Sequence, residues 1–127
     1  MKFLLTSLFI ISPLIANAGS LMCPTGDKEI LKCTAKAFVP MYPFVSVCEK
    51  NNGDTGIALS SGAGRSIEVM QASRDDQGDV TTYQATEADN DNLKFSFNKS
   101  ADPKINGTLT YTVFSVDFES KYKCVEL

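Results

Sequence analysis

The chain has 127 residues, a formal net charge of −3 and no histidine. Nucleic acids and anionic membrane surfaces are bound through clustered lysine and arginine, so a negative chain without a basic stripe argues against both partners. The usual base of a serine or cysteine triad is missing, and we expect neither an enzyme nor a cofactor.

Residues 1–18 have the pattern of a secretory signal peptide. Lys2 is followed by an apolar run over residues 3–15, and Ala16-Asn17-Ala18 fits the small-x-small cleavage rule. The run is too short for a comfortable membrane span, and acylation as a lipoprotein would require a small residue before Cys23. We therefore predict a periplasmic or secreted protein, with residues 19–127 as one mature domain and no membrane insertion after cleavage.

The mature chain has the rhythm of short strands rather than of helices. Apolar residues recur with a period of two, and clusters of turn-forming residues recur about every ten residues. The clusters cover residues 40–43, 51–54, 61–64, 75–78, 89–92 and 102–107. This pattern predicts an all-β fold, a small antiparallel meander of about eight strands, either a barrel or a sandwich, stapled by disulfides.

The clearest strands lie in the second half of the chain. Strict alternation with polar neighbours places five side chains inside: Leu93, Phe95, Phe97, Leu109 and Tyr111.

After Val113 the apolar positions change parity, and Phe114, Val116 and Phe118 become the in-register set. No turn-forming residue lies between Val113 and Val116. We interpret the change as a β-bulge in one long strand, followed by a turn near residues 119–121 and a final strand.

In an up-and-down meander, successive turns lie at opposite ends of the sheet. One end would then carry residues 40–43, 61–65, 89–92 and 119–121, and the other residues 51–54, 75–78 and 102–107. This arrangement brings Met41, Tyr42 and Arg65 to one end.

Four cysteines, Cys23, Cys33, Cys48 and Cys124, predict two disulfides in an exported chain. With no histidine and no Cys-x-x-Cys pair, we expect no zinc and no other metal. If the sheet closes, the first and last strands meet, and Cys33–Cys124 with Cys23–Cys48 would fasten that seam. The alternative joins Cys33 to Cys48 across the first hairpin and Cys23 to Cys124. We favour the first pairing because it secures the longest-range contact.

An acidic stretch, Glu87-x-Asp89-x-Asp91, begins like a calcium-binding loop. It then departs from the pattern, because Asn92 stands at the position of the required glycine and Asn98 at that of the bidentate glutamate. The stretch is more typical of a solvated turn.

The stretch SSGAGRS, residues 60–66, lacks both the lysine and helix of a phosphate loop and the order of a nucleophile elbow. It is typical of a hairpin turn. Ser61-Gly62 is similar to a Ser-Gly stretch in a loop of small periplasmic β-barrels that inhibit c-type lysozymes. Arg65 replaces the tyrosine expected shortly afterwards and no longer motif matches, so the similarity does not define a family.

Two classes of function follow. The first is an exported binding module, a protein-interaction or inhibitor-like domain that contacts another exported protein through Met41, Tyr42 and Arg65. Tyr42 between two prolines would be a rigid aromatic anchor or, alternatively, a cap on the barrel, and Arg65 suits a carboxylate.

The second class is a carrier for a small apolar ligand. Its pocket would be lined by the aromatic side chains of the chain, namely Phe38, Phe44, Tyr83, Phe95, Phe97, Tyr111, Phe114 and Phe118. Side chains alone can fill an eight-stranded barrel. A filled core therefore favours the binding module.

Overall fold

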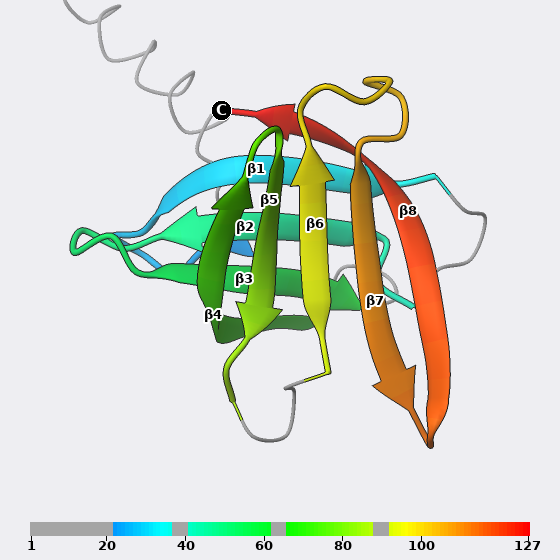
Figure 1. The fold of residues 1–127 in the computed structure, drawn as a ribbon. Coiled ribbons are helices and arrows are strands. Elements are labelled where there is room, and N and C mark those ends of the chain that lie inside the picture. Colours follow the sequence, from blue (N-terminus) through cyan, green and yellow to red (C-terminus); the bar gives the residue numbers. More distant parts are fainter. Residues whose placement is uncertain (1–21, 37–40, 62–65, 88–91) are drawn as a thin grey trace, which may run out of the picture.

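Eight antiparallel strands form the fold in the computed structural model, which describes residues 22–36, 41–61, 66–87 and 92–127 (Figure 1). In chain order they are β1 (Lys28–Ala35), β2 (Phe44–Glu49), β3 (Thr55–Ser61), β4 (Ser66–Gln77), β5 (Val80–Ala85), β6 (Lys94–Asn98), β7 (Gly107–Val113) and β8 (Val116–Glu126). The predicted signal peptide lies outside the described residues. Within them, no helix is long and apolar enough to cross a membrane.

Each strand pairs with its neighbour in sequence, and β1 pairs with β8, so the sheet closes into a barrel rather than a sandwich. Two long strands turn the corners. β4 pairs with β3 through residues 66–72 and with β5 through residues 72–77, and β8 changes partner from β7 to β1 at Tyr122. As a result, β1–β3 run across β5–β7 in Figure 1.

The interior is the one that the period-two pattern predicts. All five side chains expected inside, on β6, β7 and the residue before β6, are at most 7% exposed, which confirms the prediction. The rings of Phe95 and Tyr122 meet edge to face, with centroids 5.8 Å apart. Burial of each large apolar side chain contributes about 1.5–3 kcal/mol. The other large buried side chains of the interior are Leu31, Val45, Val47, Ile57, Leu59, Met70 and Tyr83.

The disulfide pairing favoured from the sequence is confirmed. Cys33 lies opposite Cys124 across the β1–β8 seam, with Cα atoms 4.0 Å apart. Three residues away on one side Leu127 N–H donates to the Ile30 carbonyl, and three residues away on the other Lys36 N–H donates to the Lys121 carbonyl. The cysteines thus occupy a non-hydrogen-bonded pair, where facing side chains are closest.

The second disulfide, Cys23–Cys48, fastens the segment before β1 to the outside of the barrel. Val47 and Ile57 belong to the interior, so their neighbours Cys48 and Ala58 face outward. Cys23 packs against both.

The predicted β-bulge after Val113 is wrong. β7 ends at Val113 and β8 begins at Val116, joined by a two-residue turn in which Phe114 has φ 51° and Ser115 φ 65°. Positive φ at both turn residues is characteristic of a type I′ hairpin, which normally uses Asn-Gly. The parity changes because the chain reverses. The predicted turn at residues 119–121 is also wrong, since they lie inside β8.

The turns alternate between the two ends of the barrel, with Phe114-Ser115 in place of the expected residues 119–121. We name as the hairpin end the one that carries residues 41–43, Phe114 and Ser115. The mouth end carries residues 50–54, 78–79 and 99–106.

Candidate functional site

The β7–β8 hairpin projects beyond the rest of the barrel. β6 pairs with β7 only as far as Thr110, and β1 reaches β8 only up to Lys121. Between these points, among the described residues, the two strands pair only with each other. Figure 1 shows their tip at the lower right, clear of the other described strands.

Large apolar side chains are exposed on this hairpin. Phe114 at the tip is 95% exposed, Val116 53% and Phe118 43%. Met41, on the segment before β2 at the same end, is 45% exposed. Scattered apolar residues are normal on a surface, but several at one end of a small protein are typical of a protein-binding site.

A row of aromatic rings connects the hairpin to the barrel. Phe118 stacks on Tyr111 with centroids 5.6 Å apart and planes at 19°, and Tyr111 meets Tyr42 edge to face at 5.4 Å. The hydroxyl of Tyr122, deep in the barrel, donates a 2.5 Å hydrogen bond to the Tyr42 carbonyl. The row therefore has a rigid base.

Burial keeps the phenols of Tyr42 and Tyr122 protonated. Burial is the main cause that raises the pKa of Tyr42, and the negative charge of Glu68 and the neighbouring Tyr111 raise it further. Burial also raises the pKa of Tyr122 far above its usual range. At neutral pH these hydroxyls are uncharged hydrogen-bond donors, and Glu68 on β4 supplies negative charge beside them.

The residues proposed from the sequence differ in their exposure and position in the structure. Met41 is an exposed side chain at the hairpin end. Tyr42 is half-buried and packs against the core, so it also caps the barrel. Arg65 lies outside the described residues. Cys23, Cys33, Cys48 and Cys124 are all disulfide-bonded.

The exposure of the hairpin was not expected from the sequence. The carrier hypothesis places Phe114 and Phe118 in an internal pocket with Phe44, but all three are exposed, and Phe44 is 43% exposed on the outer side of β2. The change of parity after Val113 was the available signal, because a two-residue hairpin turn produces the same change as a bulge.

Part of the lining proposed for a carrier pocket belongs to the buried core. Of the proposed lining residues, Tyr83, Phe95, Phe97 and Tyr111 are core side chains in mutual contact with the rest of the interior. Phe38 lies outside the described residues. Close packing of this kind makes the core rigid, so that it holds the strands and their surface residues in place.

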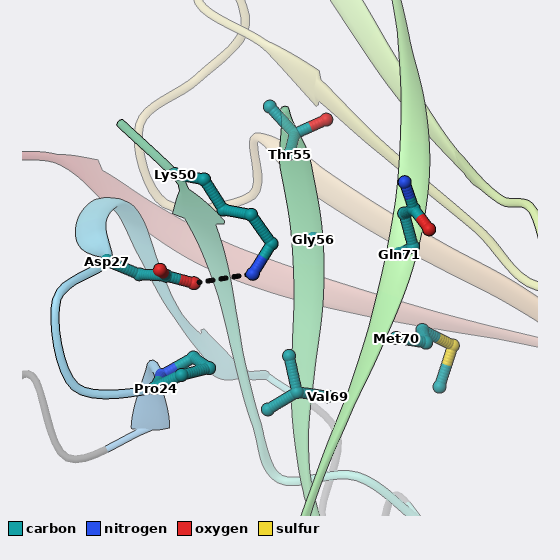
Figure 2. A pocket seen from close by; sticks show the side chains of 8 residues that line it. All are labelled: Pro24, Asp27, Lys50, Thr55, Gly56, Val69, Met70 and Gln71. Carbon is teal, nitrogen blue, oxygen red and sulfur yellow. Dashed lines mark hydrogen bonds and ion pairs between the residues drawn. The ribbon is translucent and has the colours of Figure 1, made fainter. Parts of the chain in front are cut away.

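One pocket, of about 380 Å³, lies on the outer wall between the segment before β1 and strands β3 and β4. Lys50 extends to Asp27 across it in Figure 2, with Nζ 3.5 Å from the carboxylate. At Gly56 a Cβ would lie 3.1 Å from the Met70 carbonyl oxygen, so part of the floor is backbone. The Lys50 ammonium group and the Asp27 carboxylate thus form an ion pair with each other.

Comparison with protein-family models, curated proteins and solved structures gives no match for this chain. Among the described residues, no three side chains of the types that bind metals form a cluster.

Proposed function

We propose that this chain is an exported β-barrel binding module that docks another exported protein at its hairpin end, in the manner of an inhibitor. The observation that supports it most is the aromatic side chain of Phe114, which is 95% exposed. It lies on a turn whose positive φ angles are unfavourable for bulky residues. Bulky side chains at positive φ are uncommon, and such strain tends to occur at functional sites.

The physical basis is a pre-ordered aromatic anchor. Aromatic residues carry much of the binding energy in interfaces, and a rigid scaffold reduces the ordering cost of association. Phe118 and Tyr111 stack, and Tyr42 is held by Tyr122. The hairpin therefore presents Phe114 on a fixed base.

The partner's surface should be apolar with basic residues around it. Asp117 and Glu119 lie on the exposed part of β8, and Glu68 lies near Tyr42. Complementary charge increases the rate and specificity of association. The Ser61-Gly62 stretch is similar to one in lysozyme inhibitors, and Ser61 is the last residue of β3, at this same end. A c-type lysozyme is therefore the first partner to test.

The proposed location in the cell rests on the disulfide bonds and on the pattern of residues 1–18. Two disulfides and no free cysteine among the described residues suit an oxidising compartment. Together with the signal-peptide pattern of residues 1–18, this favours the periplasm or the exterior. The proposed role is binding, not catalysis, since no histidine is available as a base.

The test compares two exposed apolar residues at opposite ends. Phe114→Ser removes the anchor, and Ile105→Ser, at a residue 48% exposed in a mouth-end loop, is the matched control. Mature wild-type and variant proteins are titrated with c-type lysozyme and used as bait with periplasmic or secreted proteins.

We expect Phe114→Ser to weaken binding of the captured partner by about thirtyfold or more, as loss of an interface hot spot does, and Ile105→Ser to leave it unchanged. Circular dichroism must show both variants folded. Equal affinity of both variants for every captured partner would contradict the proposal.

A further inference from the structure

The mouth end holds a second, separate pocket of about 220 Å³. Buried apolar side chains form its inner part and charged side chains from four different segments form its rim. The inner part consists of Leu31, Tyr83 and Phe97, and the rim of Glu49, Arg74, Lys99 and Glu126. Its residues come from the end of the barrel opposite to Phe114.

Tyr83 places a phenol at this pocket. The residue is 2% exposed, and its hydroxyl is not one of the buried polar atoms that lack a hydrogen-bond partner, since Ser60 Oγ is the only such atom among the described residues. The Arg74 guanidinium carbon lies 5.8 Å from the centre of the ring. Burial raises the pKa of Tyr83; Arg74 opposes that shift, and Asp76, Glu49 and Glu126 reinforce it. The charged side chains around the pocket therefore act on the Tyr83 hydroxyl.

A phenol hydroxyl on the wall of a pocket can donate a hydrogen bond to water, or to an acceptor on a ligand that displaces the water. Because Tyr83 lines the pocket, an acceptor that enters it can reach the ring's polar end. A carboxylate is the strongest acceptor of this kind.

Three of the four rim charges have no ion-pair partner among the described residues. Within the described residues, Lys99, Glu49 and Glu126 form no ion pair, since the three pairs present are Lys50–Asp27, Arg74–Asp76 and Lys121–Glu119. Arg74 contacts Asp76 through Nε, at 3.2 Å, which leaves the two terminal nitrogens of its guanidinium unused. Two cations and two anions therefore surround one opening without neutralising one another.

We propose that the mouth binds a small zwitterion with an apolar side chain, the chemistry of a free α-amino acid. The carboxylate accepts hydrogen bonds from the Tyr83 hydroxyl and the Arg74 guanidinium, with Lys99 nearby. The ammonium group lies between Glu49 and Glu126. The apolar side chain contacts Leu31 and Phe97. The volume is below the range of about 300–1,000 Å³ typical of pockets for drug-sized ligands, as suits so small a molecule.

The experiment is a nitrogen-15 NMR titration of the mature protein with three probes of one ring size. L-phenylalanine carries both charges, 3-phenylpropanoate only the carboxylate, and phenethylamine only the ammonium group. We expect L-phenylalanine to produce saturable shifts at Arg74, Tyr83 and Phe97. Each single-charge probe should bind about tenfold more weakly, as loss of one charge-assisted hydrogen bond predicts.

Two variants separate the two halves of the site. Tyr83→Phe keeps the ring and should weaken L-phenylalanine about tenfold. Glu126→Gln should weaken L-phenylalanine and phenethylamine but not 3-phenylpropanoate. Glu119→Gln, at a residue of the hairpin, is the control and should change nothing.

The proposal is overturned if L-phenylalanine gives no saturable shifts up to about 10 mM, a range that covers weak millimolar binding. It is equally overturned if the three probes bind alike, or if Tyr83→Phe binds L-phenylalanine as tightly as the wild type. None of these measurements depends on the hairpin end, so they leave the proposed function untouched.

Discussion

Phe114 and Ser115 oppose the local preference of the chain. A turn with positive φ at both positions suits Asn-Gly, because glycine has no Cβ to clash and asparagine tolerates the left-handed region. Phe114 has φ 51° and Ser115 φ 65°. The pairing of β7 with β8, which continues up to Val113 and Val116, holds them there, and the cost of such strain is about 1–3 kcal/mol for each residue.

Because the turn is strained, we expect a variant with a relaxed turn to be more stable but to bind the partner more weakly. The double variant Phe114→Asn with Ser115→Gly should raise the free energy of unfolding by about 1–2 kcal/mol, because it relieves the turn. It should also lose the partner, because the aromatic ring is gone. Urea denaturation measures the first effect. Phe114→Ser alone is the control, and it should change stability less. An unchanged or lower free energy of unfolding in the double variant would show that the turn is not strained.

At the scale of one element, the start of β7 depends on a glycine. At Gly107 a Cβ would lie 2.6 Å from the Cys124 sulfur and 2.9 Å from Cζ of Phe95. Asn106, just before it, both donates to and accepts from the backbone of Cys124, at 3.1 and 2.7 Å. The strand therefore approaches the Cys33–Cys124 seam more closely than any side chain permits.

We expect Gly107→Ala to lower the free energy of unfolding by about 1–3 kcal/mol, the usual cost of overpacking a core. Thr108→Ala, at the next and outward-facing position of β7, is the matched control and should stay within about 0.5 kcal/mol. Chemical denaturation of both variants measures the difference. Equal stability of the two would mean that the seam yields easily at this point.

For the whole molecule, the two disulfides close loops of very different length. Cys33 and Cys124 are 91 residues apart in sequence, and Cys23 and Cys48 are 25 apart. In the chain-entropy description a bridge stabilises by restricting the unfolded chain, and the effect grows with loop length. The seam bridge should therefore contribute more, in addition to joining the first and last strands.

We expect the loss of each disulfide to lower the free energy of unfolding by a different amount. Replacing Cys33 and Cys124 together by alanine should cost about 4–5 kcal/mol, and replacing Cys23 and Cys48 about 3–4 kcal/mol. Urea unfolding of the two double variants gives the order, and peptide mapping of the unreduced wild type checks the pairing. A larger loss from the Cys23 and Cys48 variant would show that the cluster outside the barrel matters more than closure.

The sequence by itself determined what depends on a repeating local pattern. The alternation around Phe95 and Tyr111 identified inward-facing side chains, because successive side chains of a strand point to opposite faces. Eight strands joined by short turns predicted a meander, and closure of that meander led to the Cys33–Cys124 pairing. It also brought Met41 and Tyr42 to the end of the barrel that now carries the candidate site.

Only the tertiary structure decided what depends on groups meeting from distant parts of the chain. A bulge and a two-residue turn change strand parity alike, and β1 and β6 had to be placed before the projecting hairpin and exposed Phe114 became visible. The mouth likewise combines Glu49, Arg74, Tyr83 and Glu126, from four different strands. Periodicity predicts the face on which each side chain lies. Barrel closure decides which side chains gather at each end, because it sets how the strands are staggered against one another.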